Sequence, residues 1–421
     1  MAPQIQSVEV ARYRGFRDAQ QWSLGRLTLF YGENNAGKSA LLRALPVLAE
    51  SRTPGRAGLA LGDPVRRAAF REVQWRGGVP SGEDDDVVLG LGLSDGTSWK
   101  WTFRWLPRGL AVIQEVAVSQ GAEPVVFVRA DLEAPDPKDV EYTGTNGAQR
   151  LQFDGIIPRP GTHPLVDGCR DGLIGALEGV VWLSAMRKAP AREGTAVGAP
   201  GSLTGNGEGA AALLLADEHL RAEVSRWFEK HTRHRVTVES LGSELRRLVL
   251  DPLQGAAIQI PFPDAGEGLQ QVFPVVVALA HLRRAGGTLC VEEPEGHLHP
   301  RLQKGLAELI VEVLSEQPSA SVVLETHSEL FLVAALTAAL KPLAGAVRLF
   351  WVETSADGSA TIESIPLDET GRPTTPRLEQ AFATMGAMER DLIQARRSGR
   401  DATASSSKPL GGAEKPRSHG G

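Results

Sequence analysis

Residues 32–39 read Gly-Glu-Asn-Asn-Ala-Gly-Lys-Ser, and this octapeptide decides how the rest of the chain is interpreted. It follows an apolar, strand-like run at 27–31 and precedes a run at 40–45 that is typical of a helix start. Strand, glycine-rich turn and helix is the order in which a phosphate-binding loop occurs. The glycines let backbone N–H groups curl around phosphate oxygens, and the helix N-terminus adds donors and the positive end of its dipole. A chance glycine-rich turn is the alternative, but both flanks favour a P-loop.

This loop supplies most of the predicted binding residues. Lys38 is expected to reach the β- and γ-phosphates of a nucleotide, and the Ser39 hydroxyl is expected to ligate Mg²⁺. The candidate nucleotide-binding residues of the loop are Gly32, Asn34, Asn35, Ala36, Gly37, Lys38, Ser39 and Ala40.

The composition is that of an ordinary globular protein. The chain has 421 residues, of which 42% are hydrophobic and 23% charged, and its net charge is −6. No apolar run approaches the roughly 20 residues that span a bilayer, and the first residues do not resemble a signal peptide. Two cysteines make no disulfide framework, so we expect a cytoplasmic protein without a membrane partner. Small arginine clusters leave DNA as a candidate partner, although solvated surface charges explain them as well.

Two further strands end in polar residues suited to phosphate chemistry. The strand at 287–291 runs into Glu292, expected in the Mg²⁺ shell, and Glu293, expected to align and deprotonate the attacking water. The strand at 321–325 ends in Thr-His-Ser, where His327 is expected to donate a hydrogen bond to the γ-phosphate. Alone, each is more simply a charged strand exit or an ordinary loop histidine. Their agreement with the P-loop favours the catalytic interpretation.

A second glycine-rich turn, at 264–271, precedes an apolar helix predicted over 272–282. Gly266 and Gly268 are candidates to contact a phosphate that a second subunit binds. A flexible helix N-cap is the simpler alternative for this turn.

The intervening segments predict mixed α/β structure. Residues 70–129 alternate as an antiparallel meander. Tryptophans interleaved with Lys and Arg in the meander indicate a sheet with one packed face or, less simply, a base-stacking surface. Residues 130–170 are predicted as loop, and residues 210–231 as one helix.

The order of these motifs resembles that of ABC-class ATPases of the SMC, RecF and OLD kind. Residues 292–300, Glu-Glu-Pro-Glu-Gly-His-Leu-His-Pro, are similar to the acidic string of stand-alone prokaryotic ATPases related to the OLD group. Residues 325–328 resemble their switch-histidine element, and residues 266–274 resemble their signature, usually G-x-G-x-S-Q-x-L-P. Two shorter landmarks, at 183–187 and 205–208, also look like those of the group.

The resemblance implies an α/β fold of the P-loop NTPase class. It would be an ABC-type ATPase head over 1–397, with a mixed sheet, an antiparallel N-terminal meander and a helical subdomain at about 205–285. A closing helix is expected at 376–397, and a disordered tail at 398–421. Two heads would sandwich ATP and Mg²⁺ in a homodimer or higher oligomer, each P-loop opposed by the other chain's glycine turn. With no TOPRIM nuclease motif in the chain, the implied partner is a separate effector, a nuclease or toxin, in prokaryotic defence or DNA transactions.

The chain departs from the family's pattern at two positions. Glu292 replaces the usual Walker B aspartate, and Gln270 replaces the signature serine. Gln74 is the candidate Q-loop residue, while His297 and His299 are expected at a subunit interface rather than on zinc. Two other functions stay open. A transporter-type ATPase subunit is disfavoured because no Leu-Ser-Gly-Gly-Gln signature occurs, and an ATP-dependent dimerisation module with negligible turnover is disfavoured because both acidic residues are present.

Overall fold

A six-stranded sheet brings the predicted motifs to one edge. Its strands, in spatial order, are β12 (Val180–Leu183), β17 (Gly287–Glu292), β18 (Ala320–Glu325), β3 (Leu27–Gly32), β19 (Val347–Thr354) and β20 (Ala360–Ile365). The first five are parallel, and β20 pairs antiparallel with β19. The central strands are apolar runs buried on both faces, as a parallel sheet requires. The carboxyl ends of β3, β17 and β18 therefore lie side by side.

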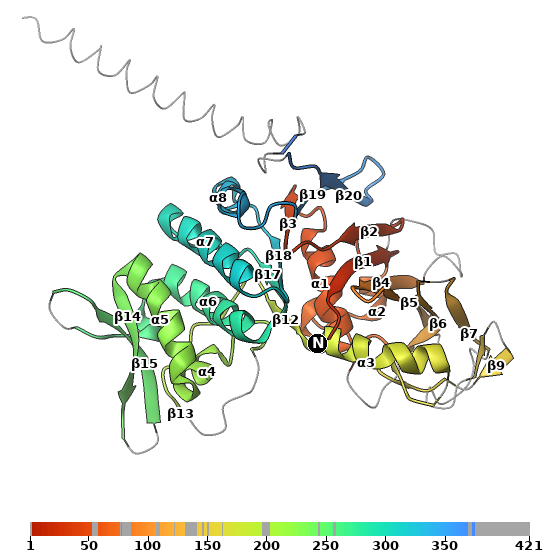
Figure 1. Ribbon diagram of the computed structural model, residues 1–421, viewed down its shortest axis with the longest axis horizontal. Helices are drawn as coiled ribbons and strands as arrows, with labels where there is room; N and C mark the ends of the chain where they lie inside the picture. The colour runs from red at the N-terminus through yellow and green to blue at the C-terminus, as the bar shows by residue number, and fades with distance from the viewer. Residues whose placement is uncertain are drawn as a thin grey trace, which may run out of the picture. The chain divides into compact units, whose positions relative to one another are not determined.

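Helices cover both faces of this sheet (Figure 1). Helices α6 (Glu267–Ala285) and α7 (Pro300–Glu316) pack on one face, with α8 (Glu329–Ala339) beside α7. Helix α1 (Lys38–Glu50) covers the other face and also contacts the N-terminal strand β1. The helix that starts at the P-loop is thus buried between two sheets.

The second sheet is the predicted antiparallel meander. Its order is β2 (Gln20–Ser23), β1 (Ile5–Ala11), β4 (Val87–Leu93), β5 (Thr97–Leu106), β6 (Leu110–Gln120), β7 (Val125–Arg129), β8 (Tyr142–Gly144) and β9 (Gly147–Gln149). Trp99 and Trp101 are 1% and 0% exposed and stack with ring centroids 5.9 Å apart. The base-stacking interpretation of these two tryptophans is therefore wrong, because their face of the sheet packs into the core.

A helix, α3 (Pro164–Glu178), occupies part of the segment that was predicted as loop. Pro164 stands at the helix start, and the His163 side chain caps it by accepting a hydrogen bond from the Leu165 N–H. Its buried side chains recur at helical spacing, among them Val166, Cys169, Leu173 and Leu177. Proline and glycine content hid this periodicity in the sequence. Short elements complete this part of the chain: η1 (Asp63–Val65), α2 (Phe70–Val73), β10 (Phe153–Asp154) and β11 (Ile157–Pro158).

The subdomain before α6 mixes helices with strands. The single helix predicted over 210–231 is two, α4 (Ala210–Ala216) and α5 (Glu218–Thr232), because Asp217 leaves the helical conformation and caps α5 by accepting from the Leu220 N–H. A small sheet lies beside them. Its strands are β13 (Gly194–Thr195), β15 (Leu245–Pro252), β14 (His234–Ser240) and β16 (Ile260–Pro261), and η3 (Phe262–Asp264) follows.

The computed structural model describes residues 2–52, 58–75, 77, 86–106, 110–121, 123–130, 141–144, 147–149, 151–161, 163–195, 203–242, 245–255, 258–368 and 373–374. The chain divides into two compact units, 1–372 and 373–421, and the elements above all belong to the first. The closing helix predicted at 376–397 and the tail predicted at 398–421 fall outside the described residues. Within the described ranges, no helix is both long and apolar enough to cross a membrane.

Candidate active site

The P-loop has the backbone geometry that its glycines predicted. Gly32 has φ 144°, and a Cβ there would lie 2.1 Å from the Val352 carbonyl oxygen of β19. Gly37 has φ 103° and stands at the N-cap of α1, where no side chain caps the helix. The first N–H groups of α1 therefore have no partner within the helix and can face an anion.

Lys38 is folded back across its own loop. Its side chain is 2% exposed, and Nζ donates to the carbonyl oxygens of Gly32 at 3.0 Å and Glu33 at 2.5 Å. Burial lowers the pKa of Lys38, while the charges of Glu325, Glu293 and Glu33 act to raise it. An ammonium group has three donors, so one is left for a phosphate oxygen.

Ser39 contacts a carboxylate that the sequence did not single out. Its Oγ donates to Glu325 Oε1 at 2.7 Å, and Glu325 is 2% exposed at the end of β18. Burial, and then the charge of Glu292, raise the pKa of Glu325 to about 7. The sequence feature that could have identified Glu325 is its position at the end of a strand, directly before Thr326 and His327.

Glu292 lies in a closed ion pair instead of at an open ligand position. It is 1% exposed, and Arg43 donates to both of its carboxylate oxygens at 2.5 Å. Trp182 Nε1 donates to Oε1 at 2.9 Å, and the Ala185 N–H lies 3.4 Å from Oε2. Because Arg43 stands one turn after Ser39 on α1, it reaches the carboxylate that was expected to serve the metal. In this geometry Glu325, not Glu292, is the acid beside Ser39.

Glu293 and His327 face each other at the rim. Glu293 Oε1 lies 3.8 Å from His327 Nε2, and their side chains are 42% and 35% exposed. Burial, and then the charge of Lys38, lower the pKa of His327, which favours a neutral ring. Glu293 has φ 41°, a left-handed conformation that costs a non-glycine residue about 1–2 kcal/mol.

Arg187 fixes this unusual turn from a distance. It is 3% exposed, and its guanidinium donates to the carbonyl oxygens of Glu292 at 2.9 Å and Glu293 at 3.0 Å. It also donates to the carbonyls of Ser184 at 2.7 Å and Gln271 at 2.8 Å. The Gln271 side chain returns two bonds to the Arg187 backbone, at 3.0 and 2.6 Å. The acidic loop and the start of α6 are thus joined through one buried side chain.

Glu295 holds the switch histidine in a similar way. It is 7% exposed, and its Oε1 accepts from Thr326 Oγ1 at 2.5 Å, the His327 N–H at 3.2 Å and the Ser328 N–H at 3.3 Å. The fourth residue of the acidic string therefore positions the backbone that carries His327.

The predicted glycine turn overlaps the first residues of α6, which begins at Glu267 and not at 272, and this segment packs against the acidic loop. A Cβ on Gly268 would lie 2.6 Å from the His297 carbonyl oxygen, whereas a Cβ on Gly266 would meet nothing. Gln270 Nε2 donates to the carbonyls of Pro263 at 2.9 Å and Ala265 at 2.7 Å, so this side chain braces its own turn.

The two histidines of the acidic string differ in place. His297 has φ 60°, and His299 caps α7 by accepting from the Arg301 N–H at 3.3 Å. A capping role explains His299 without a partner subunit.

The P-loop opens into a cleft of about 790 Å³, a volume suited to a nucleotide-sized ligand. Its lining joins residues 35–40 with Arg14, Arg43, Gln74 and His327. The candidate Q-loop residue thus lines the same cleft as the P-loop.

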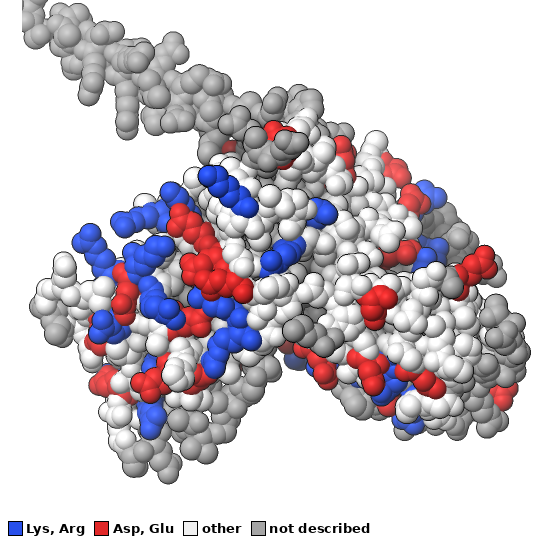
Figure 2. Space-filling view, viewed as in Figure 1, with Lys and Arg blue, Asp and Glu red and all other residues white. Residues whose placement is uncertain are grey.

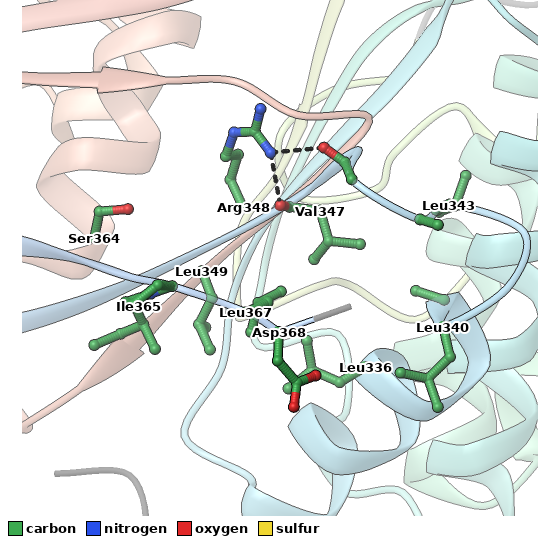
Figure 3. Close-up of a pocket in the computed structure, with 14 residues that line it drawn as sticks. Leu336, Leu340, Leu343, Val347, Arg348, Leu349, Ser364, Ile365, Leu367 and Asp368 are labelled. Atoms are coloured by element: carbon green, nitrogen blue, oxygen red, sulfur yellow. Dashed lines mark hydrogen bonds between the residues drawn. The ribbon is translucent and has the colours of Figure 1, made fainter. Parts of the chain in front are cut away.

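A second cavity, of about 580 Å³, lies between α8 and the strands β19 and β20 (Figure 3). Its lining is mostly apolar, with Leu336, Leu343 and Ile365 among its residues. Arg348 donates to the backbone carbonyls of Gly345 at 2.8 Å and Val347 at 3.0 Å. Of these two cavities, the P-loop cleft is the one whose residues suit a phosphate, because Arg348 in the second cavity is bonded to backbone carbonyls.

Charged side chains on the face shown in Figure 2 alternate in sign. Arg283, at the end of α6, contacts the carboxylates of Glu223, Glu312 and Glu316 at 2.7–3.1 Å. The charge of Arg283 is therefore balanced by three carboxylates.

Comparisons with known proteins concern one segment of the sequence and the overall fold. A family profile described as "AAA domain, putative AbiEii toxin, Type IV TA system" matches residues 228–334, which include the acidic loop and the switch histidine. No curated protein has a sequence that matches the chain at a significant level. Among solved structures, the chain is similar to an SMC head bound to the C-winged helix domain of ScpA. The TM-score is 0.50 and the identity 12%, over 87% of this chain and 99% of that one.

Two other solved structures are similar. One is the SMC head domain from Thermotoga maritima, with a TM-score of 0.40, 10% identity, and coverage of 86% of this chain and 100% of that one. The other is an SMC head domain with an extended coiled coil bound to the C-terminal domain of ScpA, derived from Pyrococcus furiosus. Its TM-score is 0.47 and its identity 9%, over 92% of this chain and 100% of that one.

The first likeness, at 12% identity, concerns the fold alone. This fold agrees with the SMC-like part of the resemblance drawn from the sequence. By its fold, the chain is similar to the head domains of SMC proteins.

Proposed function

We propose that this chain binds Mg-ATP at the P-loop cleft and hydrolyses it. One observation carries the proposal: Lys38, Ser39, Glu325, Glu293 and His327 converge from the ends of three adjacent parallel strands. This is the edge at which open parallel sheets bind ligands.

The residues present fit ATP and Mg²⁺. The uncapped start of α1 and the third donor of Lys38 suit phosphate oxygens, and the Ser39 hydroxyl and Glu325 carboxylate supply the oxygen ligands that Mg²⁺ prefers. Bound Mg-ATP would supply the γ-phosphoryl group. Glu293 would accept the proton of the attacking water, and His327 would donate a hydrogen bond to the charge that develops. Glu292 would not ligate the metal directly, because Arg43 and Trp182 donate hydrogen bonds to its carboxylate oxygens.

We further propose that two copies act together, in a homodimer or higher oligomer. The turn at 266–271 of a second copy would complete each site, with Gly266 and Gly268 near its phosphates. The Arg187–Gln271 junction supports this, since it joins that turn to the carbonyl of Glu293. Engagement of the turn would therefore shift the residue that activates water.

The chain would pass this motion to a separate protein. A similar SMC head is bound to ScpA, and the matching family profile names a putative toxin. We propose an effector, a nuclease or toxin, in prokaryotic defence or DNA transactions. A pull-down from native cells that recovers neither an effector nor nucleic acid would contradict this role.

The first test is the steady-state ATPase rate and solution mass of wild type beside Glu293→Gln, with and without double-stranded DNA. Losing a general base costs about 10²–10⁴-fold, so we expect at least a 100-fold slower variant that accumulates as an ATP-bound dimer. Glu308→Gln, on the exposed side of α7, is the matched control and should behave as wild type. If wild type neither hydrolyses ATP nor dimerises, the proposal is wrong. ATP-dependent dimers without turnover would indicate a dimerisation module, and membrane association would indicate a transporter subunit.

A further inference from the structure

Three side chains at the rim form a compact group of metal-ligand types. Glu293, Glu325 and His327 each offer one ligand atom, and these atoms lie within 4.8 Å of one another. Two ligands on one ion stand about 3–4 Å apart at metal–ligand distances of about 2.1 Å. Glu293 Oε1 and His327 Nε2 already lie 3.8 Å apart on partly exposed side chains, so small rotations would bring the three ligand atoms to one ion.

The buried member of this group has an unused oxygen. Glu325 is 2% exposed, its Oε1 accepts from Ser39, and its Oε2 is buried without a hydrogen-bond partner among the described residues. A buried carboxylate oxygen without a partner destabilises the fold. A cation beside it would offset that cost.

The charges around the group leave room for a cation. Glu292 is neutralised by Arg43, and the Lys38 ammonium is turned toward the carbonyls of its own loop. Among the described residues, neither Glu293 nor Glu325 is therefore paired with a Lys or Arg side chain.

We propose that Glu293, Glu325 and His327 bind a transition-metal ion, with Mn²⁺ as the probe, in the absence of nucleotide. Two carboxylates and an imidazole suit such ions, whereas Mg²⁺ prefers oxygen ligands and water. The ion would be bound by Glu293, the residue proposed to activate water. Glu293 could therefore not act as a base until ATP displaces or recruits the metal. This site uses residues of the proposed ATPase mechanism, but its existence does not depend on ATP turnover.

The test is a Mn²⁺ titration of the full chain without nucleotide, followed by electron paramagnetic resonance of free Mn²⁺. We expect one site per chain that Glu325→Gln weakens at least tenfold and that excess Mg²⁺ displaces poorly. Pulsed measurements should show a nitrogen coupling that His327→Gln removes. Glu308→Gln should leave both signals unchanged.

His327→Gln changes a partly exposed side chain and should fold. If Glu325→Gln does not fold, Mn²⁺ binding by His327→Gln still tests the proposal. The proposal is overturned if Mn²⁺ binds only with ATP present, or if both variants bind it as wild type does. A fluorescent ATP analogue in EDTA, with Lys38→Ala as the control, reports nucleotide binding separately. Loss of that signal with intact Mn²⁺ binding would count against the ATPase proposal alone.

Discussion

The two loops that meet at the site keep their shapes by different means. The P-loop at 32–38 is shaped by its own backbone, through positive φ at Gly32 and Gly37 and contacts within the loop. The acidic loop at 292–295 is held by Arg187, more than a hundred residues earlier in the chain. A substitution in the P-loop should therefore act locally. A substitution that releases the acidic loop from Arg187 should also affect the start of α6.

Arg187→Ala should have the largest effect. It removes four hydrogen bonds to backbone carbonyls and leaves a cavity at a residue that is 3% exposed. We expect a loss of about 3–5 kcal/mol in the free energy of unfolding, measured in urea. Hydrogen exchange should rise both in the acidic loop and at the start of α6.

Arg187→Lys is the matched control for charge. Lysine cannot reproduce the planar fork, so this variant should fold but hydrolyse ATP more slowly than wild type. If hydrogen exchange in Arg187→Ala rises in the acidic loop alone, the acidic loop and the start of α6 are not coupled through the Arg187 side chain.

The difference between a loop shaped by its own backbone and a loop held by a distant residue also explains what the sequence could predict. The P-loop and the strand ends follow from local patterns, and so do the predicted roles of Lys38 and Ser39. Arg43 on Glu292 and Ser39 on Glu325 are pairs separated by 249 and 286 residues, and no local pattern reveals them. Helix α3 was missed for the opposite reason: its periodic pattern was present at 166–177, but glycine, proline and charge obscured it.

Gly32→Ala tests the loop that is shaped by its backbone. A Cβ would lie 2.1 Å from the Val352 carbonyl, and φ is 144°. We expect a loss of about 2–4 kcal/mol in the free energy of unfolding, together with loss of nucleotide binding. Gly96→Ala is the control, because Gly96 also has positive φ but its Cβ would meet nothing within 4 Å. Its loss should be about 1 kcal/mol, and equal losses at both positions would mean that the clash contributes nothing.

Gln270→Ser changes the turn without touching the Arg187 junction. The side chain's bonds to the Pro263 and Ala265 carbonyls would be lost, so we expect a loss of about 1 kcal/mol in stability. Serine would restore the hydroxyl that is usual at this signature position. ATP-dependent dimerisation, measured by light scattering, should therefore strengthen, and Gln270→Ala should lose stability without that gain. A serine variant that dimerises no better than the alanine variant would argue against a role for this position in trans.

At the C-terminal end of α6, an exposed ion pair can be compared with the buried Arg187–Gln271 junction at the start of the helix. Its loss should have the smallest effect. Arg284, in the last turn, donates to Asp217 at 2.6 Å, and Asp217 also caps α5. The backbone hydrogen bond from Leu220, and then Arg284, lower the pKa of Asp217 below its ordinary 3.8. A depressed folded-state pKa stabilises the fold above the unfolded pKa and ceases to do so as pH falls through the folded value. Asp217→Ala should therefore cost about 1 kcal/mol, measured in urea between pH 5 and 8, and the difference from wild type should shrink below about pH 4. Hydrogen exchange in the acidic loop should stay unchanged in this variant, since Asp217 contacts the opposite end of α6 from the Arg187 junction.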